Sequence, residues 1–157
     1  MNPTSYLPCG PAKLEVLDIK HIDGMLLDAA VAIASGAIIE PASYHAAGKT
    51  RWYPAVRFTP TEDYTLELGN YQPTEEWALC AELLDLAPIN VGGRVISTFF
   101  VSNDNKFVGP YKGSTKKEAI CRCLVAYKLG ADNIELPRWL IKYADAHHAA
   151  LCTDVVV

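Results

Sequence analysis

One short segment and one distant arginine supply the kinds of group that bind phosphate-bearing ligands. The segment reads Tyr-Gln-Pro-Thr-Glu-Glu-Trp from Tyr71 to Trp77, and the arginine is Arg122. Thr74 fits the N-cap of a helix, whose start offers unpaired N–H groups and partial positive charge. Arginine can hold a phosphate through two parallel hydrogen bonds, while aromatic rings offer stacking surfaces. If the helices that begin at Thr74 and Thr115 pack as neighbours, these groups converge on one nucleotide-like anion. The predicted ligand-binding residues of this set are Tyr71, Thr74, Trp77 and Arg122.

The same residues also have a purely structural explanation. Thr74 can cap its own helix, and Trp77 can fill the core. Arg122 can pair with a carboxylate of the protein instead of a ligand. The carboxylates considered as partners are those of Glu75, Glu76 and Glu118. The sequence leaves both explanations open.

A second set of basic and aromatic residues lies between positions 45 and 53. Its members are His45, Lys49, Arg51, Trp52 and Tyr53. Cations interleaved with rings can hold a nucleotide or a single-stranded nucleic acid, so Arg51 and Trp52 join the predicted ligand-binding residues. Proline and glycine interrupt residues 38–54, which we interpret as a loop with a short extended piece. A loop packed against the domain is the alternative explanation for these residues.

Charge and motifs exclude several classes of protein. The net charge is −4 at pH 7 and the pI is about 5.5, which argues against general nucleic-acid binding because that requires many neutralised phosphates. The sequence has no phosphate-binding Walker loop, no nucleophile elbow and no His-Glu-x-x-His motif. We therefore predict no catalytic residues, no cofactor and no enzymatic activity. The competing enzyme hypothesis would use His21, His45 or Glu76 as an acid–base group.

The cysteines and histidines do not predict a metal site. The five cysteines are irregularly spaced, and Cys121 and Cys123 point to different faces if they lie on a helix. Buried, reduced thiols are the expected state. His147 and His148 lie near Asp145, but adjacent helical residues cannot share one metal ion, so solvated side chains are expected there.

The chain of 157 residues has the length of one domain. Residues 1–12 contain three prolines and predict an irregular lead-in to a single domain at 13–157. Strands are predicted at 14–19 and 94–102, with 106–109 pairing back as a hairpin. Helices are predicted at 25–35, 74–86, 115–129 and 138–152. These elements predict an α+β fold in which a small, mostly antiparallel sheet packs with about four helices as a layered α/β sandwich.

Three segments of the chain resemble the NinX-like small phage proteins and the related phage α-β-α sandwich domains. The segments are Leu27–Gly36, Tyr71–Trp77 and Thr115–Pro137, the last with its arginine, its Lys-Leu-Gly helix end and its proline. The chain departs from the family pattern after Trp77, where a Gly-Gly pair is missing. The resemblance implies an accessory protein of a phage or prophage that acts in the cytoplasm of the bacterial host.

These observations predict a non-enzymatic protein that binds a small nucleotide-like anion and could sequester a host defence signal. A protein–protein interaction module is the alternative, because Trp139 and Tyr143 share the apolar side of the last predicted helix. The expected partners are a nucleotide-like molecule, a host or phage protein, or a second copy of the chain. No stretch of the sequence is apolar for long enough to span a bilayer, so no membrane partner is expected.

Overall fold

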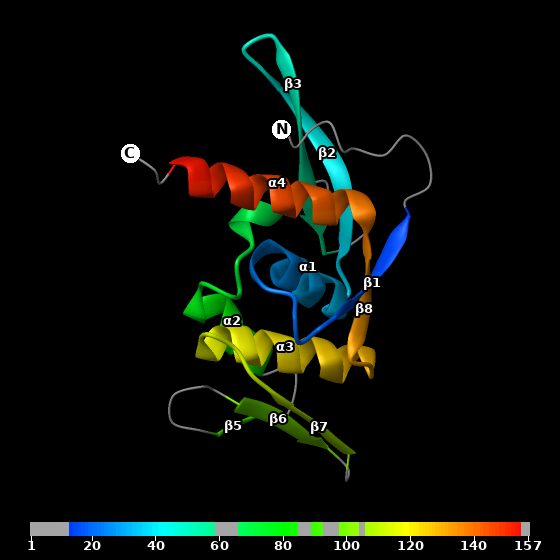
Figure 1. Cartoon of the computed structure of the whole chain (residues 1–157), viewed down its shortest axis with the longest axis vertical. Helices are drawn as coiled ribbons and strands as arrows, with labels where there is room; N and C mark the ends of the chain where they lie inside the picture. The colour runs from blue at the N-terminus through cyan, green and yellow to red at the C-terminus, as the bar shows by residue number, and fades with distance from the viewer. Residues whose placement is uncertain (1–12, 59–65, 85–88, 93–97, 104–105, 155–157) are drawn as a thin grey trace.

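Helix α1 (Gly24–Ala34) lies at the centre of the molecule, between α3 (Lys116–Leu129) and α4 (Arg138–Asp154) (Figure 1). Its sequence is apolar on nearly every side, and every residue from Leu27 to Ala32 is buried. A helix that is hydrophobic all round is stable only inside the protein, which explains its position. One cluster of buried side chains joins this helix to α3, α4 and the neighbouring strands.

The computed structural model describes residues 13–58, 66–84, 89–92, 98–103 and 106–154. The predicted lead-in at 1–12 lies outside these residues. The same holds for the start of the strand predicted at 94–102 and the end of the helix predicted at 74–86.

Helix α3 begins and ends as its sequence predicts. The Thr115 hydroxyl accepts a hydrogen bond from Glu118 N at 3.1 Å. The Glu118 carboxylate in turn accepts from Ser114 N at 3.3 Å and Ser114 Oγ at 2.8 Å. This reciprocal arrangement satisfies N–H groups that a helix start leaves unpaired. The helix ends at Gly130, whose φ of 65° is a left-handed conformation that glycine adopts without steric cost.

Within the described residues, the strands form three small antiparallel sheets. Strand β1 (Leu14–Asp18) pairs with β8 (Asn133–Pro137), the strand that leads directly into α4. Strands β5 (Ile89–Gly92), β6 (Thr98–Asn103) and β7 (Lys106–Tyr111) form a second sheet that packs under α3. The third sheet holds β2 (Ile38–Ala46), β3 (Lys49–Arg57) and the short β4 (Leu66–Glu67), which η2 (Leu68–Asn70) follows. Helix α2 (Trp77–Leu84) packs on α3.

The predicted α+β class is confirmed, with helices and antiparallel strands stacked in layers. One expectation was wrong: residues 38–54 are not a loop but most of a long hairpin that projects past α4 (Figure 1). Ala47 and Gly48 form its turn with φ values of 53° and 74°, the conformation that two-residue hairpin turns require. Pro41 and Pro54 obscured the strand pattern in the sequence. They are register partners in the hairpin, so the two residues that lack a backbone N–H lie opposite each other.

Candidate functional site

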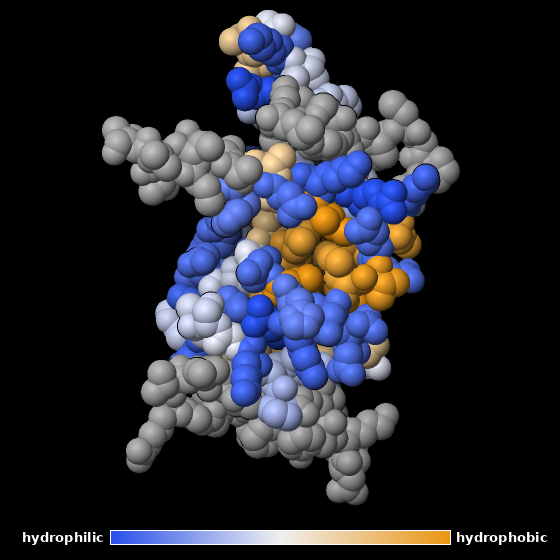
Figure 2. All heavy atoms as spheres, in the orientation of Figure 1, coloured by the Kyte–Doolittle hydropathy of each residue, from blue (hydrophilic) through white to orange (hydrophobic). Residues whose placement is uncertain are grey.

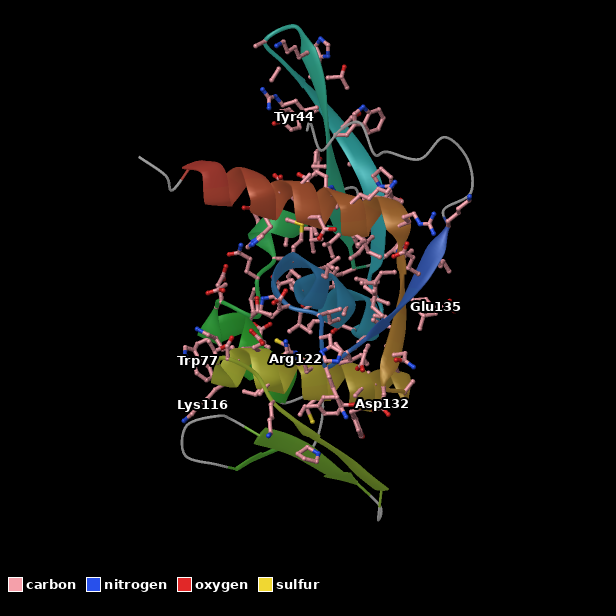
Figure 3. The ribbon with its side chains drawn as sticks, in the orientation of Figure 1. Tyr44, Trp77, Lys116, Arg122, Asp132 and Glu135 are labelled. Atoms are coloured by element: carbon pink, nitrogen blue, oxygen red, sulfur yellow. The ribbon has the colours of Figure 1, made fainter. Side chains whose placement is uncertain are left out.

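Arg122 projects from α3 toward the loop before α1, where it is held by protein groups on several sides (Figure 3). It is only 8% exposed. Its Nε and Nη2 donate to Ile22 O at 3.1 and 2.9 Å, and its Nη1 donates to Lys112 O at 2.6 Å. Nη2 also lies 2.7 Å from Glu118 Oε1. These contacts employ four of the five N–H groups of the guanidinium, so the structural explanation accounts for most of this side chain.

A pocket of about 420 Å³ opens beside the same arginine. Its lining residues are Lys20, Pro110, Lys112, Gly113 and Arg122. We call this the basic pocket, because three of its five lining residues carry positive charge. The Glu118 carboxylate neutralises Arg122, while the exposed Lys20 and Lys112 side chains leave the pocket cationic.

Gly113 shapes the wall of the basic pocket. A Cβ atom at this position would lie 2.6 Å from Ala119 N and 2.8 Å from Thr115 O. Such distances are too short for a side chain, so only glycine allows the chain to approach the start of α3 this closely. The tight approach places Lys112, one residue earlier, against the arginine.

Thr74 does not cap α2, which corrects one of the sequence predictions. Helix α2 begins at Trp77, and its first backbone hydrogen bond runs from Cys80 N to Glu76 O at 3.0 Å. Thr74 instead lies in a turn in which Glu75 N and Glu76 N both donate to Gln72 O. Pro73 is the second residue of this turn, and the turn delays the helix by about three residues.

Thr74 contacts a buried carboxylate on α1. Its N–H donates to Asp28 Oδ1 at 3.0 Å. Burial raises the pKa of Asp28 to about 7, a rise that hydrogen bonds with Thr74 oppose and the charges of Glu75 and Glu76 reinforce. Thr74 Oγ1 is buried and makes no hydrogen bond of good geometry. It nevertheless lies close enough to the Asp28 carboxyl to lower its pKa. The pair lines a cavity of about 430 Å³.

The two aromatic residues of the predicted site have different environments. Tyr71 is buried, meets Phe58 edge-on with ring centroids 5.4 Å apart, and has a pKa raised to about 12 by burial. Trp77 is 52% exposed, and Lys117 Nζ lies 5.3 Å from its ring centroid. The alternative that Trp77 fills the core is therefore wrong, whereas Tyr71 belongs to the core.

The four residues of the first predicted set therefore do not converge on one ligand. Thr74 lines the cavity near Asp28, and Tyr71 is in the core. Arg122 lines the basic pocket, and Trp77 is on the surface (Figure 3). Helices α2 and α3 do pack as neighbours, as the prediction required. Because α2 starts only at Trp77, Thr74 does not lie at the N-terminus of this helix.

Arg51 and Trp52 are adjacent on β3, so their side chains point to opposite faces of the hairpin. Arg51 pairs in register with Tyr44, and Lys49 and Tyr53 share its face. The rings of Tyr44 and Tyr53 lie 5.7 Å apart on this face. Trp52 is exposed on the other face, opposite Ser43. The hairpin thus separates the two predicted residues, although each is accessible.

Sequence reasoning missed Asp28, Lys20 and the role of Lys112 in the basic pocket. A charged residue inside an otherwise apolar helix was the available signal for Asp28, and the same signal did identify Arg122. Lys20 carries no comparable signal, because it reaches the pocket from a turn after β1.

Cys80, Cys121 and Cys123 are free and buried, the state predicted for the thiols. A hydrogen bond with the Cys80 thiol raises the pKa of Cys121, and burial raises that of Cys123 to about 12. Neither thiol is therefore poised as a nucleophile. Among the residues described, no three His, Cys, Asp or Glu side chains are grouped so as to hold a metal ion.

Comparisons with known proteins leave the chain without an assigned family. No protein-family model and no curated protein match the sequence. The similarity of three segments to NinX-like phage proteins thus remains an expectation. Within the described part of the chain, no helix combines the length and apolar character needed to cross a membrane.

Proposed function

We propose that the protein is a non-enzymatic binding protein whose basic pocket holds a small anion with a phosphate or carboxylate group. The observation that carries this proposal is the meeting of Lys20, Lys112 and Arg122 around one pocket of about 420 Å³. That volume lies within the range of about 300–1,000 Å³ typical of small-molecule sites. Only one carboxylate, that of Glu118, pairs with these three cations in the hydrogen bonds and ion pairs of the described residues.

Arg122 contributes a fixed wall of the basic pocket rather than a free bidentate fork. Its contacts with Ile22 O, Lys112 O and Glu118 immobilise the guanidinium before any ligand arrives. Binding therefore costs no further ordering of this side chain. Lys20 and Lys112 are exposed, and their ammonium groups supply the charge that is not neutralised within the protein.

The phage context enters through the resemblance of the three segments. A small accessory protein in the bacterial cytoplasm that holds a nucleotide-like anion could sequester a host defence signal without turning it over. The lining of the basic pocket offers Pro110 as its apolar wall. Phosphate recognition would thus dominate over recognition of a base.

The first test is native mass spectrometry of the purified protein, followed by denaturation and identification of any released molecule. Isothermal titration with ADP and with pyrophosphate then tests the basic pocket. We expect the Lys20→Ala/Lys112→Ala double variant to bind at least about tenfold more weakly, because each charge-assisted hydrogen bond contributes about 1.5–3 kcal/mol. Lys128→Ala is the matched control, since Lys128 is an exposed lysine of α3 outside the pocket. Equal affinities in both variants, or no binding of any anion, would rule out the proposal.

A second proposal is a protein–protein interaction module. The outer face of β1 exposes Leu14 and Val16 at 55% and 63%, and Figure 2 shows apolar residues gathered over strands β1 and β8. Contiguous exposed apolar side chains often mark interaction surfaces. Light scattering of the wild type and of Leu14→Ser/Val16→Ser tests whether this face joins two copies. A wild-type protein that is monomeric at all concentrations would exclude self-association through this face.

A further inference from the structure

A second cavity, of about 430 Å³, lies between the first half of α1, the turn at 72–75 and the middle of α4. Its charged or titratable lining residues are Asp23, Asp28, Glu75, Asp145, His147 and His148. No lysine or arginine is among its lining residues in the described part of the chain. We call it the acidic cavity. Its sign is opposite to that of the basic pocket, so the two cannot serve one ligand group.

Two polar side chains in the wall of the acidic cavity lack a full set of partners. Asp28 is only 4% exposed, and the hydrogen bond described for its carboxylate comes from Thr74 N. Thr74 is also buried, and its Oγ1 has no hydrogen-bond partner of good geometry. Buried carboxylates and hydroxyls normally have partners in the folded protein. A ligand with hydrogen-bond donors can satisfy these groups from the cavity that they line.

We propose that the acidic cavity binds an organic cation, a primary amine or a guanidinium group. Four carboxylates from three separate segments surround the space, and a cation with several N–H donors complements both their charge and their acceptors. The volume suits a small molecule or one basic side chain. The ring of His147, which stacks on Tyr143 with centroids 6.2 Å apart, adds a flat wall from α4.

Proton binding competes with this cation. The carboxyl of Asp28 has a pKa raised to about 7 by burial, so near neutrality it is partly protonated in the empty cavity. Glu75 and Glu76 face it from the turn, Asp23 from the start of α1, and Asp145, His147 and His148 from α4. All the carboxylates favour a cation, and the histidines oppose one only when protonated. Binding should therefore release a proton and strengthen as the pH rises.

Two sources can supply the same chemistry, a free polyamine or a lysine or arginine side chain of another polypeptide. Spermidine and methylguanidinium represent the free cations. Acetyl-Gly-Lys-Gly-amide and acetyl-Gly-Arg-Gly-amide represent side chains of a polypeptide. Binding of the first pair assigns a small-molecule ligand, whereas binding of the peptides alone assigns a protein partner.

The experiment measures the affinity of the intact protein for these four probes by isothermal titration at pH 6 and pH 8. From a pKa of about 7, affinity should rise about tenfold between the two pH values. Asp28→Asn should abolish this pH dependence and weaken binding about tenfold or more. Asp145→Asn, at an exposed position on α4, should weaken binding without disturbing the core.

Glu135→Gln removes an exposed carboxylate of β8 outside the cavity and is the matched control (Figure 3). Unchanged binding in the control with weaker binding in both cavity variants supports the proposal. Binding that falls equally in all three variants would show attraction to net charge alone and overturn it. The proposal is also overturned if none of the four probes binds at millimolar concentration. The anion titrations of the basic pocket use different variants, so either proposal can fail while the other survives.

Discussion

Replacing Arg122 with methionine should destabilise the protein far more than replacing an exposed arginine. Methionine keeps an unbranched apolar stem but leaves Ile22 O, Lys112 O and the Glu118 carboxylate without the donors they have now. Removing one partner of a buried ion pair costs about 3–5 kcal/mol, because the other is left uncompensated. For a domain of this length, that loss lowers Tm by about 6–20 °C.

The assay is urea unfolding followed by circular dichroism, with Arg138→Met as the matched control. Arg138 Nε lies 2.8 Å from Glu15 Oε1, but the two side chains are 48% and 38% exposed. Exposed pairs contribute about 0–1 kcal/mol, so this variant should unfold almost like the wild type. Arg122→Lys should fall between the two, since a single ammonium cannot reproduce the guanidinium fork. A loss below about 1 kcal/mol in Arg122→Met would refute the view that this arginine holds α3 to the chain before α1.

Three further predictions concern other positions. Between pH 3.8 and about 7 the folded state keeps a proton on Asp28 that the unfolded state has released. The free energy of unfolding should therefore fall by up to about 4 kcal/mol as the pH rises, and it should depend less on pH in Asp28→Asn. Parallel pH profiles of the two proteins in urea unfolding would contradict this. Gly113→Ala should lower the free energy of unfolding by about 1–3 kcal/mol, because the added Cβ would overlap Ala119 N. Gly69→Ala should lower it less, because no atom lies within 4 Å of the added Cβ. Calorimetry compares the two variants. Trp77→Ala should cost less than about 1 kcal/mol, since the ring is half exposed and a single lysine lies over it; a larger loss in thermal unfolding would show that the ring packs more tightly than this geometry implies.

Helices α1 and α3 were predictable because their signals are local, whereas the late start of α2 was not. The limits of α3 follow from Thr115, Glu118 and Gly130, all within the helix or one residue beyond it. Burial of α1 follows from its apolar sequence, in which Asp28 is the one charged residue. The α+β class followed in turn, since alternating apolar patterns and capped helices were both present in one chain.

The hairpin β2–β3 shows where local signals mislead. Pro41 and Pro54 each argue against a strand when considered alone. Their effect is small only because they occupy the same rung of the ladder, a fact that depends on the register between two strands. The same register places Arg51 beside Tyr44 and turns Trp52 away.

Local signals were enough to predict the limits of α1 and α3, the fold class and the unusual position of Arg122 in an apolar helix. The contacts of each predicted site residue depended on tertiary packing. Arg122 meets Ile22 across 100 residues, and Thr74 meets Asp28 across 46. Helix caps act within about one turn of the chain, whereas a pocket is made by segments that are distant in sequence. Residue types therefore identified groups able to bind a ligand, and packing separated them into a basic pocket, an acidic cavity, the core and an exposed surface.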